Sequence, residues 1–95
     1  MSAAGKRRMA RVANLGCILC RRLGYGQTPA EVHHIRTEQG AASRASDGNT
    51  IPLCVEHHRG ATGLHGMGRK AFERTYKVTE IDLLGETNLL LEDAR

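Results

Sequence analysis

The spacing of apolar residues divides the chain into short elements, beginning with a basic N-terminal segment. Residues 6–15 have apolar positions three apart and would form a short helix. These positions are Met9, Val12 and Leu15. Gly16 ends this helix, and we expect residues 1–5 before it to be disordered.

Two short runs in the middle of the chain have the composition of β-strands. Residues 30–35 contain Val and Ile, and residues 49–53 form the second run, in which Pro52 favours an edge position or an early end of the strand. The polar stretch between them, residues 36–48, is unusually long for a loop without a function. The pattern therefore predicts a β-hairpin with a long tip.

Helical spacing returns after the second strand. Residues 54–59 open a short helix, and a series of glycines prevents its continuation: Gly60, Gly63, Gly66 and Gly68. Residues 69–77 predict another helix. Thr79, with Asp82 three residues later, would form a capping box for a final amphipathic helix. We expect this last helix to be interrupted near Gly85.

So short a chain is expected to form one domain, over residues 1–95, with a marginal core. It contains no Trp, one Phe and two Tyr, so a metal, a disulfide or a partner should add stability. Its three cysteines cannot all pair with one another. Since no apolar stretch suits a signal peptide or a membrane span, we expect a reducing compartment and metal-binding cysteines.

Charge is distributed unevenly along the chain. Residues 1–22 carry six basic residues and no acid, whereas residues 80–95 carry five acids and one base. A basic arm on a compact domain suits a polyanion such as nucleic acid. A solvated tail would have the same composition, so this feature alone does not decide between the two.

Cysteine and histidine occur in two pairs with the same spacing. Cys17 and Cys20 are separated by two residues. Cys54 and His57 repeat this gap, which lets a turn aim two ligands at one ion. Together the pairs predict a structural zinc site that closes a loop around the hairpin. On a helix His58 would point about 100° away from His57 and serve another site. The alternative is a chance Cys-x-x-Cys pair and a merely buried Cys54.

Four histidines remain for a second site: His33, His34, His58 and His65. Adjacent residues on a strand face opposite sides, so His33 and His34 would have different roles. One would bind a metal ion while the other reaches a substrate or water, and a neutral His suits general-base chemistry at physiological pH. A divalent ion beside it would stabilise charge developing on a phosphate.

The segment His33-His34-Ile35, Asn49 and the pair His57-His58 resemble the HNH motif of ββα-metal nucleases. The Cys/His pairs resemble the zinc knuckles that many of these enzymes carry. Residues 58–65 are similar to small phage HNH proteins, of which the recombination-enhancement nuclease (Ref) family is the nearest in kind. The resemblance, over roughly residues 12–90, implies an α+β fold: a small ββα-metal (HNH) fold with a β-hairpin, a short motif helix, flanking helices and a structural zinc site.

The resemblance also implies roles within the motif. His34 would be the general base that activates water, and Asn49 would brace the loop and the base through hydrogen bonds. His33 and His58 would bind one catalytic divalent ion, commonly Mg²⁺, with Mn²⁺, Ni²⁺ or Zn²⁺ as alternatives. The ion would bridge the scissile phosphate. Spacing alone leaves a swap of roles between His33 and His34 open.

His65 and three arginines complete the candidate site. His65 would lie about 10 Å from His58 along an unbroken helix, unless glycines fold the chain back. A third metal ligand, a phosphate-binding group and an ordinary surface residue stay open for it. Three arginines are candidates for DNA phosphate contacts, or are generic surface charge: Arg36, Arg44 and Arg59.

The sequence thus predicts a metal-dependent endonuclease or nickase that hydrolyses DNA in recombination or DNA processing, in the cytoplasm of a bacterial host. Its partners would be DNA and a recombination or phage protein that recruits it, and its oligomeric state stays open. Two alternatives compete: a zinc-stabilised module that binds nucleic acid without cutting it, and a decayed HNH scaffold that serves as an interaction protein. A binding module needs only the four zinc ligands, so the second set of histidines favours the enzyme.

Overall fold

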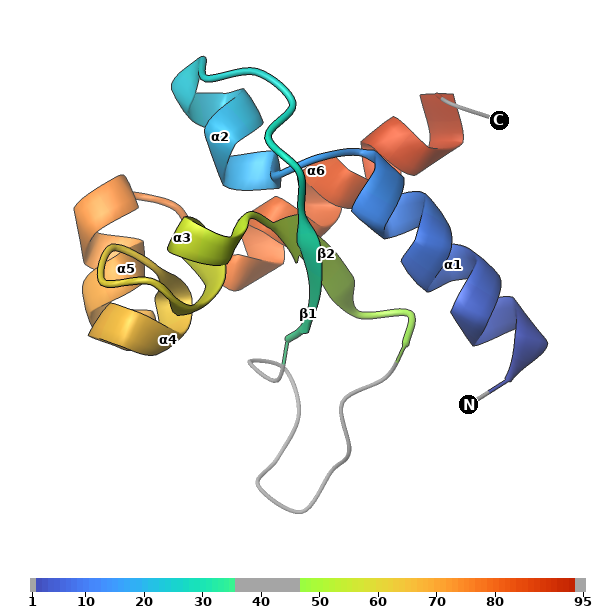
Figure 1. The fold of residues 1–95 in the computed structure, drawn as a ribbon, viewed down its shortest axis with the longest axis horizontal. Coiled ribbons are helices and arrows are strands. Elements are labelled where there is room, and N and C mark those ends of the chain that lie inside the picture. The colour runs from blue at the N-terminus through green and yellow to red at the C-terminus, as the bar shows by residue number, and fades with distance from the viewer. Residues whose placement is uncertain (1, 36–46, 94–95) are drawn as a thin grey trace.

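One antiparallel hairpin, surrounded by helices, forms the centre of a small α+β fold (Figure 1). The computed structural model describes residues 2–35 and 47–93. In chain order the elements are α1 (Ala3–Asn14), α2 (Ile18–Leu23), β1 (Glu31–His34), β2 (Thr50–Leu53), α3 (Val55–Arg59), α4 (Leu64–Met67), α5 (Arg69–Tyr76) and α6 (Glu80–Asp93). Within these two stretches no helix has the length and apolar character needed to cross a membrane.

The hairpin confirms both predicted strands. β1 pairs with β2 in a register that places His33 opposite Ile51 and His34 opposite Thr50. Every residue of β2 is buried, because α1, α2 and α6 all pack against this strand. Most of the predicted loop, residues 36–46, lies outside the described residues.

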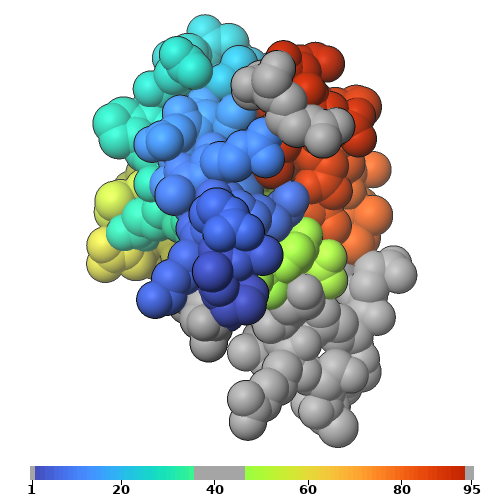
Figure 2. Space-filling view, turned by 90° about the vertical axis from the view of Figure 1, so that its right-hand side faces the viewer, coloured from blue at the N-terminus to red at the C-terminus, as the bar shows by residue number. Residues whose placement is uncertain are grey.

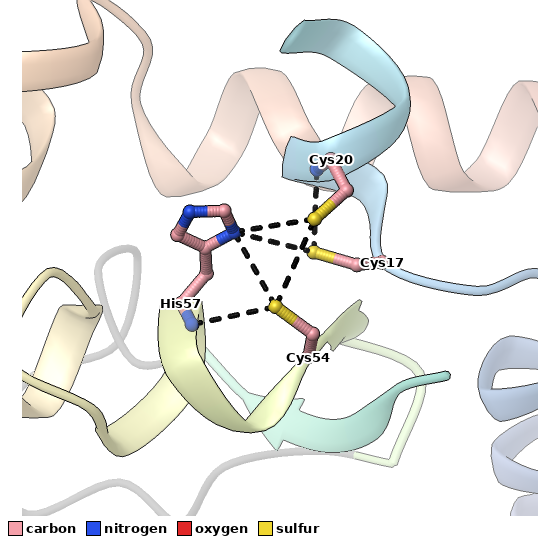
Figure 3. A group of neighbouring side chains, drawn as sticks. All are labelled: Cys17, Cys20, Cys54 and His57. Carbon is pink, nitrogen blue, oxygen red and sulfur yellow. Dashed lines mark hydrogen bonds between the residues drawn. The ribbon is translucent and has the colours of Figure 1, made fainter. Parts of the chain in front are cut away.

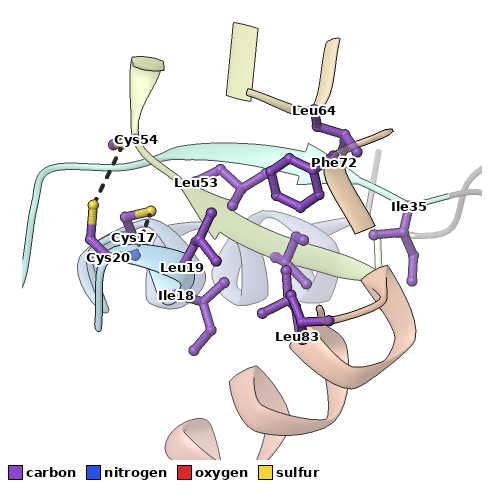
Figure 4. Close-up of a cluster of buried hydrophobic side chains, with 12 residues drawn as sticks. Cys17, Ile18, Leu19, Cys20, Ile35, Leu53, Cys54, Leu64, Phe72 and Leu83 are labelled. Carbon is purple, nitrogen blue, oxygen red and sulfur yellow. Dashed lines mark hydrogen bonds between the residues drawn. The ribbon is translucent and has the colours of Figure 1, made fainter. Parts of the chain in front are cut away.

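The helices cover the hairpin from several sides. Figure 1 shows α1 on one side of the strands and the group α3, α4 and α5 on the other. Between them, Leu19 of α2, Leu53 of β2, Phe72 of α5 and Leu83 of α6 meet in a core in which all four side chains are fully buried (Figure 4). The cysteines lie at one end of this core, so the Cys/His cluster directly adjoins the apolar packing.

The N-terminal prediction needs correction. Residues 1–5 were expected to be disordered, but α1 begins at Ala3. Ser2 is its N-cap, since the Gly5 N–H donates to the Ser2 hydroxyl oxygen at 2.9 Å. A capping Ser satisfies a backbone donor that would otherwise be unpaired at the helix start. Met1 lies outside the described residues.

The C-terminal helix begins as predicted but is not interrupted. The Asp82 N–H donates to the Thr79 hydroxyl at 3.0 Å, and the Thr79 N–H donates to the Asp82 carboxylate at 3.1 Å, which confirms the capping box. The predicted break near Gly85 is wrong, because α6 is continuous from Glu80 to Asp93. Gly85 is exposed, so it lowers helix propensity without removing any buried contact. The short helices α2 and α4 were not predicted.

Candidate functional site

The three cysteines and His57 form one buried group at the junction of two helix N-termini (Figure 3). Cys17 is the N-cap of α2 and Cys54 is the N-cap of α3. In both turns the cap sulfur accepts a backbone N–H three residues later, from Cys20 at 3.3 Å and from His57 at 3.4 Å. The shared two-residue gap therefore produces the same local turn twice, and each turn presents its two ligands to a common point.

The separations within this group fit a tetrahedral metal ion. His57 Nδ1 lies 3.4 Å from the sulfurs of both Cys20 and Cys54 and 3.8 Å from that of Cys17. The Cys20 and Cys54 sulfurs are 3.8 Å apart. Tetrahedral zinc with ordinary bond lengths places two sulfurs about 3.8 Å apart and a sulfur and a nitrogen about 3.6 Å apart. The four ligand atoms are thus already at metal-binding spacing.

Burial also disfavours the charged forms of ligands in this group. It raises the pKa of the Cys17 thiol to about 12, although backbone hydrogen bonds oppose the shift. Burial lowers the pKa of His57 as well. Cys17 would therefore stay a neutral thiol unless a bound cation compensates for burying its thiolate.

A second group brings together His33, His58 and His65, from β1, α3 and α4. One ring nitrogen from each lies within 4.8 Å of the others, and the ring centroids are 4.8–5.2 Å apart. Burial and the neighbouring imidazoles lower the pKa of His65, which favours the neutral form that binds metals. These three residues therefore also form a group that could hold a metal ion.

Glycines explain how His65 reaches His58. A side chain at Gly63 would overlap the backbone of Glu56 and His57, and one at Gly66 would overlap the carbonyl of Gly60. The chain after α3 can therefore turn back tightly, and α4 packs against α3. The distance along a straight helix does not apply here, because the helix ends at Arg59.

Two of these three histidines are oriented by carboxylates. His33 Nε2 is 2.7 Å from the Glu80 carboxylate, and both side chains are buried. His58 Nδ1 is 2.8 Å from the Glu31 carboxylate. A carboxylate on one ring nitrogen fixes the imidazole and leaves the other nitrogen available, which is the usual arrangement of metal-binding histidines.

His34 lies beside this group but is not part of it. Its Nε2 is 2.9 Å from the Asp47 carboxylate, and its side chain is about one-third exposed. A cavity of 540 Å³ is lined by the four histidines of the second set: His33, His34, His58 and His65. The adjacent strand residues His33 and His34 thus have different carboxylate partners, although both line the same cavity.

Arg59 is paired rather than free. Its guanidinium donates to both oxygens of Glu31, at 2.6–3.2 Å, while Glu31 also holds His58. Arg59 and His58 together hold the pKa of Glu31 at about 2, and Glu31 raises the pKa of Arg59.

The other predicted DNA contacts, Arg36 and Arg44, lie outside the described residues. Asn49 precedes β2, and its carbonyl accepts the Ile35 N–H at 2.9 Å.

Sequence reasoning missed the three carboxylates of this site. Glu31 is two residues before His33 on the same strand, a period-two signal that indicates a shared face. Asp47 and Glu80 have no comparable signal, since they reach His34 and His33 across 13 and 47 residues. Only the folded arrangement places them at the site.

Comparison with known proteins adds one finding. A family model described as "Recombination enhancement, RecA-dependent nuclease" matches residues 1–91. No curated protein and no solved structure matches the chain.

Proposed function

Because this chain belongs to the recombination enhancement, RecA-dependent nuclease family, we propose that it is a metal-dependent HNH endonuclease that hydrolyses DNA phosphodiester bonds. The hairpin β1–β2 and the following helix α3 would be its ββα-metal unit. The group of three cysteines and His57 would hold a structural zinc ion. The group of His33, His58 and His65 would hold a catalytic divalent ion such as Mg²⁺ or Mn²⁺.

One observation carries this proposal: besides the cysteine-rich group, the molecule has a second ligand group, and this one is open to a cavity. The group of His33, His58 and His65 has three ligands, opens to a cavity and lies beside another histidine with its own carboxylate. A structural metal site is closed by four protein ligands, whereas a catalytic site keeps a position open. A module that only binds nucleic acid would need the first group alone.

His34 is the proposed general base. Held by Asp47 at the edge of the cavity, it would take a proton from a water molecule whose oxygen attacks the phosphorus atom. The bond from phosphorus to the leaving oxygen then breaks. The divalent ion, when bound, supplies the positive charge that stabilises the phosphate oxygens in the transition state. Asn49 would brace the turn that precedes β2.

The proposed partners follow from the family description and from the charge of the chain. The dependence on RecA in that description supports DNA held in a RecA filament as the substrate. The basic N-terminal helix α1 carries exposed Lys6, Arg7 and Arg11, and such residues suit contacts with DNA phosphates. Arg59, which the sequence predicts as a DNA contact, keeps this role in the proposal through the exposed part of its guanidinium.

Plasmid cleavage tests this proposal. Supercoiled plasmid and RecA-coated DNA are incubated with the protein and either Mg²⁺ or Mn²⁺, for the wild type and for His34→Ala. The wild type should cut, and His34→Ala should cut roughly 10²-fold more slowly or worse while binding DNA equally well. If the wild type retards DNA on a gel but leaves it intact with every metal, with and without RecA, the non-catalytic binding module is correct. Equal cutting by both proteins would remove His34 as the base.

A further inference from the structure

The contact between Asp47 and His34 determines which ring nitrogen carries the proton. Asp47 Oδ1 lies 2.9 Å from Nε2 of His34. An ionised carboxylate only accepts hydrogen bonds, so Nε2 must be the protonated nitrogen in this contact. Nδ1 of the neutral ring is then the nitrogen with a free electron pair.

Asp47 is itself held through Thr50. The Thr50 hydroxyl donates to the Asp47 carbonyl oxygen at 3.0 Å. Arg8 of α1 donates from Nε to the Thr50 hydroxyl oxygen and from a terminal nitrogen to the Thr50 carbonyl, both at 3.1 Å. Thr50 is fully buried and is the strand partner of His34. A continuous series of contacts thus joins α1 to the turn that carries Asp47.

Gly5 provides a second, direct contact between α1 and Asp47. Gly5 is buried, and a side chain there would overlap the Asp47 carboxylate and lie 3.1 Å from its Cβ and Cγ. Figure 2 shows the chain just after residue 46, in light green, directly against the first half of α1, in blue. Only glycine at this position lets the carboxylate lie so close to the helix.

We infer that Asp47 is a positioning residue for the proposed base, and that α1 holds it in place through Gly5 and Arg8. The inference rests on the proposed function, since it assigns a role within that reaction. The proton taken from water goes to His34 Nδ1, while Nε2–H stays bonded to the Asp47 carboxylate, and no bond to Asp47 is made or broken. The N-terminal helix is therefore part of the active site, although it lies outside the hairpin and the helices α3 and α4 that carry the histidines.

The test compares two glycine substitutions that helix propensity alone would make equivalent. Gly→Ala within a helix normally stabilises it. Gly85→Ala is the matched control, because Gly85 is exposed in α6 and has open space around it. It should raise the melting temperature and leave cleavage unchanged. Gly5→Ala should lower kcat about tenfold or more with little change in KM, because a small displacement of the base is costly.

Asp47→Asn tests the carboxylate directly. An amide can donate to Nε2 as well as accept from it, so it no longer selects one tautomer. We expect kcat to fall roughly 10²-fold with KM unchanged. Asp47→Glu keeps an acceptor and should recover part of that loss. Melting temperatures of both variants show whether the fold is retained.

Nitrogen-15 NMR of the histidine rings supplies a readout that does not depend on cleavage. His34 is assigned by the signal missing in His34→Gln. In the wild type His34 should show the Nε2–H tautomer, and this preference should be lost in Asp47→Asn and weakened in Gly5→Ala. If the wild type does not cut but shows this tautomer pattern, the proposed function fails and the positioning role stands. An Nδ1–H tautomer in the wild type, or wild-type kcat in both Asp47→Asn and Gly5→Ala, overturns the inference.

Discussion

The two histidine-containing ligand groups differ in how they are built and in what they leave open. The group with Cys17, Cys20, Cys54 and His57 has four buried ligands. Its ligand turns are local, since each sulfur cap and its partner are three residues apart. The group with His33, His58 and His65 has three ligands from three elements and faces a cavity. The first arrangement suits a structural ion and the second suits an ion that must meet a substrate.

The two groups also differ in their contacts with carboxylates. Glu80 and Glu31 contact ligands of the open group, and Asp47 contacts the histidine next to it. In the cysteine-rich group the two cap sulfurs instead accept backbone N–H groups at the starts of α2 and α3. Carboxylates raise the basicity of a bound imidazole and fix its orientation, which matters for chemistry more than for stability. The adjacent residues His57 and His58 of α3 thus belong to different groups, which would assign stability to one group and reactivity to the other.

Loss of the cysteine-rich group should have the largest effect of all on folding. Cys54→Ser removes one thiolate ligand, whereas the serine hydroxyl can still cap α3. We expect the free energy of unfolding to fall by about 5 kcal/mol or more. A loss of this size would leave most molecules of so small a protein unfolded. Far-UV circular dichroism and metal analysis should show an unfolded chain without tightly bound zinc. His65→Ala is the control, with one zinc retained and a near wild-type melting temperature. A folded, zinc-free Cys54→Ser protein would contradict the structural role.

Removal of a ligand from the open group should affect cleavage rather than folding. His58→Ala should lower cleavage roughly 10²-fold or more, because the catalytic ion loses a ligand. The structural zinc and the melting temperature should remain close to those of the wild type. Isothermal titration with Mn²⁺ should show weaker binding than in the wild type. If His58→Ala instead releases zinc, the assignment of His57 to the structural zinc and of His58 to the catalytic ion is wrong.

Local sequence spacing was sufficient for the parts of the fold that short-range contacts determine. The repeated two-residue gap predicted that Cys17 and Cys20 would meet Cys54 and His57, and the structure brings them together. The hairpin and the Thr79–Asp82 capping box were also predicted, because each depends on residues within a few positions or on strand composition.

Tertiary contacts explain what spacing could not reveal. Glu80 reaches His33 only because α6 returns to the hairpin, and no periodic pattern links the two residues. The continuity of α6 through Gly85 has the same origin, since packing of its buried face outweighs one unfavourable residue. At the start of α1 the missed signal was Ser2, whose cap was overlooked in a segment expected to be disordered. The roles of the site residues stay predictions.

A change in one carboxylate should weaken metal binding at the open group and leave the cysteine-rich group unaffected. Glu80→Gln keeps the size of a buried side chain that contacts His33. We expect the catalytic ion to bind 10- to 100-fold more weakly, as is typical of such partners, with zinc content unchanged. Mn²⁺ titration and metal analysis on the same sample measure both quantities. Glu92→Gln, an exposed change near the end of the same helix, is the control. Unchanged Mn²⁺ affinity in Glu80→Gln would mean that the carboxylate is only a packing contact.

The smallest effect is expected from the cap that starts α6. Thr79→Ala removes the hydroxyl that accepts the Asp82 N–H and should destabilise the protein by about 1 kcal/mol, measured by urea unfolding. Because Glu80 is the first residue of α6, a loosened start should also weaken its hold on His33 slightly. Mn²⁺ affinity should therefore fall a little while zinc binding stays constant. Equal losses of Mn²⁺ affinity and zinc affinity would mean that both groups depend on the same core packing. The two groups would then not be mechanically independent of each other.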